Sequence, residues 1–112
     1  MTSQEIAEKI KNILDSKKAL NIETIEVGEK TILADYFVIA SGTSVTHVKS
    51  LADEVAYQLK TEHQLAPDHV EGESTARWIL IDYKDVVVHI FHPEEREFYS
   101  LEKLWQLSRS RA

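Results

Sequence analysis

The sequence predicts a single α/β domain in which helices flank a mixed β-sheet. The chain has 112 residues, of which 43% are hydrophobic and 29% are charged, a composition typical of one globular domain. A strand, a turn, a helix and another strand follow one another, an order that favours a crossover between parallel strands. Two β-branched runs then indicate an antiparallel hairpin. We expect residues 1–107 to form the domain and residues 108–112 to be a frayed tail.

The first predicted element is a helix, because Thr2 and Glu5 have the spacing of a capping box. Apolar residues then recur at helical spacing at Ile6, Ile10, Ile13 and Leu14. Residues 21–27 are typical of a short strand that ends at Gly28. Residues 35–40 form a compact apolar run, which we expect to be a second strand.

A second helix is predicted after the turn at residues 41–44, whose serines and threonine are good N-cap residues. Its apolar stripe consists of Val48, Leu51, Ala52, Val55 and Leu59. Residues 69–71 are expected to form a short strand. Ser100 is expected to cap a last short helix.

The strongest strand pattern lies in residues 77–82 and 85–91, separated by Tyr83-Lys84. A hairpin with this loop pairs Asp82 with Asp85, and like charges placed directly opposite repel each other. Alternation along the strands puts Ile79, Ile81, Val86, Val88 and Ile90 on one face, which we expect in the core. The other face carries Trp78, Leu80, Asp82, Asp85, Val87, His89 and Phe91, and is either covered by a helix or used to bind a protein.

Composition excludes several classes of function. The chain has no cysteine and three glycines, at positions 28, 42 and 72. These counts exclude disulfides, thiolate zinc sites, cysteine nucleophiles, the dinucleotide-binding fingerprint and the P-loop. No signal peptide or membrane-spanning stretch is visible, so we expect a soluble protein in the cytoplasm, with no membrane partner.

The net charge of −6 disfavours direct binding to nucleic acid. Residues 62–102 hold ten acidic and three basic side chains, a net charge of −7. The rest of the chain holds nine acidic and ten basic side chains, a net charge of +1. The excess of negative charge therefore lies around the hairpin. Such a field steers a protein toward a positive surface. The alternative is that the negative charge only keeps the protein soluble.

No catalytic or metal site is expected. His89 and His92 lie three residues apart, so on a continuing strand they point to opposite faces and cannot share a metal ion. Glu94, Glu95 and Glu97 are typical of a solvated helix start. The turn at residues 41–44 could bind an anion, but helix capping explains it more simply, and we expect His47 to make a surface contact.

Two blocks resemble the ribosomal silencing factor family, RsfS, also called Iojap. The first is residues 35–44 (DYFVIASGTS) with 47–49 (HVK). The second block comprises residues 78–83 (WILIDY), 85–94 (DVVVHIFHPE), 95–99 (EREFY) and 101–105 (LEKLW). The family commonly has a glycine where this chain has Lys84, so the hairpin loop is either wider here or strained at Lys84.

The resemblance implies a mixed sheet related to the nucleotidyltransferase fold, without catalysis or cofactor. It implies binding to the large ribosomal subunit through its L-type ribosomal protein number fourteen, which blocks joining with the small subunit and represses translation. A homodimer is implied for the free protein. The alternatives are assembly of the large subunit, as in organelle relatives, a general acidic adaptor, and a nucleotidyltransferase-like enzyme. The enzyme would need an Asp-x-Asp or Asp-x-Glu pair on a strand to hold magnesium, and the sequence has none there.

The predicted protein-binding residues combine aromatic anchors with acidic groups. We expect Trp78 and Tyr83 to be anchors, and Asp82, Asp85 and Glu95 to pair with lysine or arginine of a basic ribosomal protein. Arg96 and Tyr99 match the second family block and either contact the partner or position the loop after Pro93. The full set is Trp78, Asp82, Tyr83, Asp85, His89, Glu95, Arg96 and Tyr99.

Overall fold

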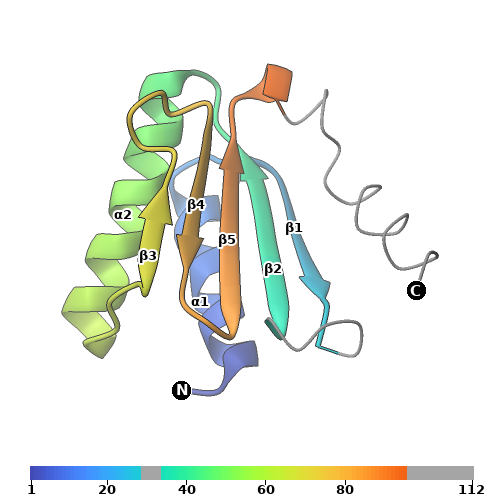
Figure 1. Ribbon diagram of the computed structural model, residues 1–112, viewed down its shortest axis with the longest axis vertical. Coiled ribbons are helices and arrows are strands. Elements are labelled where there is room, and N and C mark those ends of the chain that lie inside the picture. The colour runs from blue at the N-terminus through green and yellow to red at the C-terminus, as the bar shows by residue number, and fades with distance from the viewer. Residues whose placement is uncertain (29–33, 96–112) are drawn as a thin grey trace.

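A computed structural model of the chain describes residues 1–28 and 34–95 (Figure 1). In these ranges the chain folds into two layers, a five-stranded sheet and a pair of helices packed on one of its faces. The elements in order are α1 (Ser3–Ser16), β1 (Leu20–Glu26), β2 (Tyr36–Ser41), α2 (Val45–His63), β3 (His69–Glu71), β4 (Trp78–Asp82) and β5 (Val86–Phe91). The α/β class and the mixed sheet are confirmed.

Both helices begin at the caps that the sequence predicts. The Thr2 hydroxyl accepts from the Glu5 backbone N–H at 3.1 Å, and Glu5 Oε1 accepts from the Thr2 N–H at 2.8 Å, which completes a capping box. The Ser44 hydroxyl accepts from the His47 N–H at 3.1 Å and caps α2. The turn at residues 41–44 is therefore a helix cap, as expected. The two predicted apolar stripes are buried in full.

The sheet order is β1-β2-β5-β4-β3, and β2 with β5 is its parallel pair. The expected crossover exists, because α2 connects β2 to β3 in the same sheet. However, β3 lies at the far edge, separated from β2 by β5 and β4. The parallel neighbour of β2 is instead β5, so the predicted parallel pairing occurs between different strands.

The predicted hairpin register is wrong by two residues. Asp82 lies opposite Val87 and Trp78 lies opposite Phe91, so the expected repulsion between directly opposed Asp82 and Asp85 does not arise. The turn is Lys84-Asp85, closed by the Tyr83 N–H donating to the Val86 carbonyl at 2.9 Å. Of the two alternatives for this loop, a wider loop or strain at Lys84, the structure has the second, because the φ of Lys84 is 73°.

A shift of two residues leaves every side chain on its predicted face, because side chains alternate with a period of two. The five aliphatic residues expected in the core are all buried: Ile79, Ile81, Val86, Val88 and Ile90. They pack with the stripes of α1 and α2 in one hydrophobic cluster. Among the described residues, neither helix is both long and apolar enough to cross a membrane.

Candidate interaction surface

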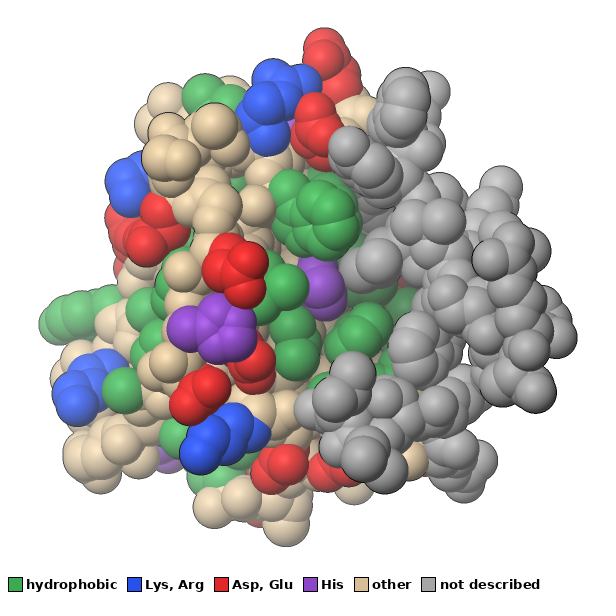
Figure 2. Space-filling model, in the orientation of Figure 1, with side chains coloured by type: hydrophobic (Ala, Val, Ile, Leu, Met, Phe, Trp, Pro, Cys, Tyr) green, Lys and Arg blue, Asp and Glu red, His purple; other side chains and the backbone are tan. Residues whose placement is uncertain are grey.

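The second face of the sheet, here called the helix-free face, is turned away from both helices of the described ranges. Strand alternation brings three sets of side chains to it. They are Phe37 and Ile39 from β2, Val87, His89 and Phe91 from β5, and Trp78, Leu80 and Asp82 from β4. Figure 2 shows hydrophobic, histidine and acidic side chains gathered together on this face.

An aromatic cluster on the helix-free face runs from the open end of the β4–β5 hairpin, where Trp78 lies opposite Phe91, to His89 and Phe37. The Trp78 indole Nε1–H donates to His89 Nδ1 at 3.2 Å. The ring centroids of Trp78 and Phe91 lie 4.8 Å apart, and those of Phe37 and His89 lie 5.0 Å apart. The cluster joins β2, β5 and β4, so the rings are held in place by three strands.

His89 is a neutral member of this cluster. It is 5% exposed, and burial lowers its pKa to about 4, because an uncharged imidazole is favoured away from water. Since Nδ1 accepts from the Trp78 indole, we assign the ring proton to Nε2. That atom is buried, and none of the described residues gives it a hydrogen-bond partner.

The acidic part of the surface lies at the turn end of the β4–β5 hairpin. Asp82 Oδ1 accepts from the Lys84 backbone N–H at 2.6 Å. Asp85 is exposed, and its backbone carbonyl accepts from the N–H groups of Asp35 and Tyr36 at 2.7 and 3.1 Å. The turn is thereby held against the start of β2, while the Asp85 side chain points away from the core.

Tyr83 is placed differently from the other predicted residues. It belongs to the cluster between the sheet and the helices and is 6% exposed. Burial raises its pKa to about 12, and within residues 1–28 and 34–95 its hydroxyl has no hydrogen-bond partner. Of the two predicted aromatic anchors, only Trp78 therefore lies on the helix-free face.

Glu95 already has a partner within the chain. Its Oε1 accepts from Arg77 Nε at 2.9 Å, and Glu94 Oε2 accepts from Arg77 Nη2 at 3.2 Å. These pairs link the segment after β5 to the residue before β4. Arg96 and Tyr99 lie outside the described residues, as do Ser100 and residues 108–112.

Sequence reasoning missed Phe37 and His69 as members of this surface. Phe37 precedes the buried Val38, and because neighbouring side chains on a strand face opposite sides, the sequence could have placed Phe37 on the helix-free face. Its contact with His89, however, depends on the parallel pairing of β2 with β5. His69 lies opposite Asp82 in the β3–β4 register, which a three-residue strand does not reveal by pattern.

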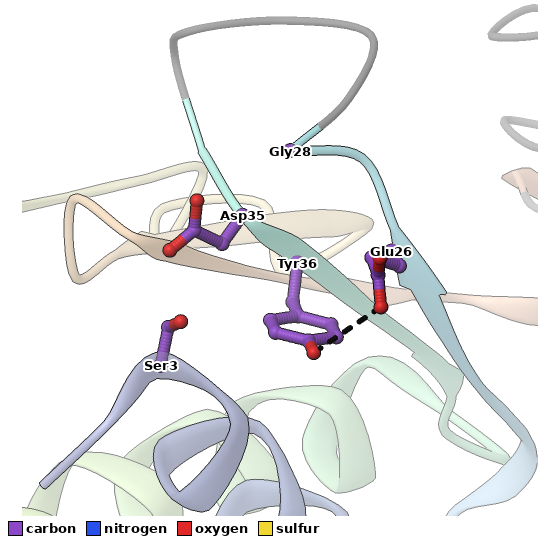
Figure 3. Close-up of a pocket in the computed structure, with 5 residues that line it drawn as sticks. All are labelled: Ser3, Glu26, Gly28, Asp35 and Tyr36. Carbon is purple, nitrogen blue, oxygen red and sulfur yellow. Dashed lines mark hydrogen bonds between the residues drawn. The ribbon is translucent and has the colours of Figure 1, made fainter.

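A pocket of about 180 Å³ lies beside the start of α1 (Figure 3). Ser3, Glu26, Gly28, Asp35 and Tyr36 line it, and the Tyr36 hydroxyl donates to Glu26 Oε2 at 3.3 Å. Small-molecule sites usually measure roughly 300–1,000 Å³. This pocket is therefore too small for a nucleotide.

His47 makes the surface contact that its position predicts. Its Nδ1 accepts from the Thr43 N–H at 2.9 Å, and its Nε2 lies 3.0 Å from the Lys17 carbonyl oxygen. With Nδ1 acting as acceptor, Nε2 carries the proton and donates to that carbonyl. The ring thus ties the cap of α2 to the end of α1, a structural role.

Comparisons with known proteins agree with the fold and the sequence blocks. The family model described as "Ribosomal silencing factor during starvation" matches residues 1–112. The ribosomal silencing factor RsfS of Halalkalibacterium halodurans is 39% identical over 105 residues, which cover 94% of this chain and 89% of that protein.

A solved structure and a mitochondrial protein are also similar to this chain. A crystal structure of a Chromobacterium violaceum protein superposes with a TM-score of 0.90 at 33% identity, covering 95% of this chain and 88% of that one. The mouse "Mitochondrial assembly of ribosomal large subunit protein 1" is 35% identical over 98 residues, or 86% of this chain and 43% of that protein. The chain therefore belongs to the ribosomal silencing factor family, a family of non-enzymatic ribosome-binding factors.

Proposed function

We propose that the chain represses translation by binding the large ribosomal subunit through its L-type ribosomal protein number fourteen, so that the small subunit cannot join. Family membership supports binding to the ribosome. The site is proposed on the helix-free face, along the β4–β5 hairpin from Trp78 at its open end to the carboxylates at its turn end. Repression then needs no chemistry, because occupancy alone excludes the opposing subunit.

The observation that carries the proposal is that one hairpin carries Trp78 at its open end and the carboxylates of Asp82 and Asp85 at its turn end. Trp78 is half-buried and oriented by His89, and an aromatic side chain held in one orientation is typical of an interface anchor. Asp82 and Asp85 are not ion-paired with any lysine or arginine of the described residues. Asp85 is therefore available to basic groups of the partner, whereas Asp82 also faces His69, whose Nδ1 lies 3.6 Å from Asp82 Oδ2.

Charge distribution supports a basic protein as the partner. The net charge of −7 in residues 62–102 disfavours contact with the phosphates of ribosomal RNA. It favours encounter with a positive protein surface and orients the approach. Glu95 contributes to this field even while it pairs with Arg77. Arg96 and Tyr99 remain proposed contacts on the strength of the family block alone.

The test is charge reversal at the hairpin end. The double variant Asp82→Lys, Asp85→Lys should no longer co-sediment with large subunits, since truncating a partly desolvated charge pair costs about 2–5 kcal/mol. Asp53→Lys, at an exposed position on α2, is the matched control and should bind normally. Light scattering should show that the wild-type chain and the control slow subunit joining, while the double variant does not.

A contrary result has a definite meaning. If the double variant has a native circular-dichroism spectrum and still co-sediments, the binding site lies elsewhere on the chain. Because Asp82 also accepts from the Lys84 N–H, its replacement could disturb the turn. Asp85→Lys alone, whose side chain is exposed, keeps the test decisive and should weaken binding on its own.

A second candidate is assembly of the large subunit, favoured by the name of the mouse mitochondrial relative. The two roles predict different phenotypes of a strain lacking the protein. Loss of an assembly factor leaves immature large subunits in growing cells. Loss of a silencing factor leaves assembly intact and raises translation during starvation, which sucrose-gradient profiles and amino-acid incorporation would separate.

The free chain is further proposed to form a homodimer, as the family resemblance implies. Size-exclusion chromatography with light scattering would give its mass directly. A mass equal to one chain of 12.8 kDa across the accessible concentration range would exclude the dimer.

A further inference from the structure

A group of side chains at the edge of the sheet combines an imidazole with carboxylates from two strands. His69 and Glu71 belong to β3, Asp68 precedes that strand, and Asp82 ends β4 directly opposite His69. One ligand atom from each of Asp68, His69 and Asp82 lies within 4.8 Å of the others. The backbone fixes this arrangement, because the Asp68 N–H donates to the Asp82 carbonyl at 2.6 Å.

The imidazole has a defined orientation in this group. His69 Nε2 lies 2.9 Å from Glu71 Oε2, a distance at which Nε2–H donates to the carboxylate. The Nδ1 atom faces the other way, 3.6 Å from Asp68 Oδ2 and 3.6 Å from Asp82 Oδ2. With the proton on Nε2, the Nδ1 lone pair therefore points toward two negative oxygens.

That arrangement favours a positive charge near Nδ1. A lone pair facing two carboxylates is repulsive, and the 3.6 Å separations are too long for hydrogen bonds. Among the described residues, no lysine or arginine pairs with Asp68, Glu71 or Asp82. Either a second proton on the imidazole or a bound cation would supply that charge.

The spacing suits a metal ion. Ligand atoms around a tetrahedral zinc ion with bonds of roughly 2.0–2.2 Å lie about 3.3–3.6 Å apart, close to the separations at Nδ1. Glu71 holds the outer nitrogen, as carboxylates do for histidines that bind metals. An imidazole combined with two carboxylates favours Zn²⁺ or a similar transition-metal ion over Mg²⁺ or Ca²⁺, which prefer oxygen ligands alone.

We propose that Asp68, His69 Nδ1 and Asp82 bind a divalent transition-metal ion of the Zn²⁺ type, with water in the remaining positions and Glu71 orienting the ring. The site joins the edge strand β3 to β4. It uses Asp82, which is also a proposed partner contact, but it does not depend on the ribosomal role. Protons compete with the metal for Nδ1, and the groups facing that atom are the carboxylates of Asp68 and Asp82.

The test is a Zn²⁺ titration of the full chain by calorimetry at about pH 7.5, where protons compete less with the metal for Nδ1 than they do at acidic pH. The wild type should bind one ion, and His69→Gln and Asp82→Asn should abolish this binding. Glu71→Gln should weaken it by about 10–100-fold. His63→Gln, which removes an exposed histidine at the end of α2, is the matched control and should leave it unchanged.

Two outcomes would overturn the proposal. One is binding by His69→Gln with the stoichiometry and affinity of the wild type. The other is a wild-type nitrogen NMR spectrum in which Zn²⁺ shifts the ring of His63 or His92 and leaves His69 in place. The NMR measurement needs no variant, so the proposal stays testable even if a substitution prevents folding.

Discussion

At the scale of single residues, the pairing of Trp78 with His89 makes the surface sensitive to protonation. His89 Nδ1 accepts from the indole only while the ring is neutral. Protonation would place two N–H donors against each other and add a charge in a buried site. The orientation of Trp78 therefore depends on a histidine that resists protonation.

We predict that the free energy of unfolding falls as the pH drops from about 6.5 to about 4. The pKa of His89 is about 4 in the folded chain and near its ordinary value once unfolded. In this window the unfolded chain binds the extra proton, so acid favours unfolding. The full effect is about 3 kcal/mol, and urea denaturation at a series of pH values measures it.

The control for this prediction is His89→Phe. Partial desolvation lowers the pKa of His69, but Glu71, Asp68 and Asp82 outweigh it and hold that pKa above its ordinary value. This contribution acts in the opposite direction, because it makes the folded chain more stable as the pH falls. Comparing wild type with variant cancels that contribution. An equally steep loss of stability in His89→Phe would show that the acid sensitivity arises elsewhere.

At the scale of elements, the β4–β5 hairpin shows what a sequence pattern can and cannot determine. The faces of both strands were predictable, because a wrong face would expose Ile79, Ile81 and Val88. The register was not, because a shift of two residues preserves the faces. The geometry of the turn determines the register. A glycine or asparagine at position 84 would have indicated a positive φ, whereas a lysine there does not.

Replacing Lys84 with glycine should stabilise the chain. The φ of 73° costs an L-residue roughly 1–2 kcal/mol, while glycine adds about 0.5–1 kcal/mol of unfolded-state entropy. We therefore expect a net gain of about 0.5–1 kcal/mol in urea denaturation. Lys49→Gly, at an exposed interior position of α2, should instead cost about 1 kcal/mol. A loss of stability in Lys84→Gly would mean that the turn is not strained in solution.

The capping box of α1 offers a second test of an element. Thr2→Ala removes the hydroxyl that accepts from the Glu5 N–H and should destabilise the chain by about 1 kcal/mol. It should also raise the pKa of the Glu5 carboxyl, which hydrogen bonding to Thr2 lowers. Urea denaturation and a carboxyl NMR titration check both effects, with Lys11→Ala on the exposed side of α1 as control. Unchanged values in Thr2→Ala would show that the cap is not populated.

At the scale of the whole molecule, sheet order was beyond the reach of local patterns. Each strand could be found from its own residues, the three-residue β3 included, but the position of β5 between β2 and β4 depends on packing across the chain. The aromatic cluster followed from that order, since Phe37 meets His89 only through the β2–β5 pair. The sequence thus predicted the residues of the candidate site that lie on the β4–β5 hairpin, but not Phe37 on β2.

The uneven charge of the molecule predicts a salt effect on association. If residues 62–102 steer the chain toward a basic protein, the rate of binding to large subunits should fall steeply as ionic strength rises. The dissociation rate should change much less. Stopped-flow measurements at several salt concentrations would show this, and an association rate independent of salt would contradict electrostatic steering.

The central β2–β5 pair also has a consequence for how the chain is made. Residues 36–41 find their parallel partner in residues 86–91, so a growing chain cannot close its sheet until almost all of the described part has been synthesised. Pairing between such distant segments is slow to form. A nascent chain that ends after α2 should therefore be readily cut by proteases, and resistance should arise in one step once β5 is complete.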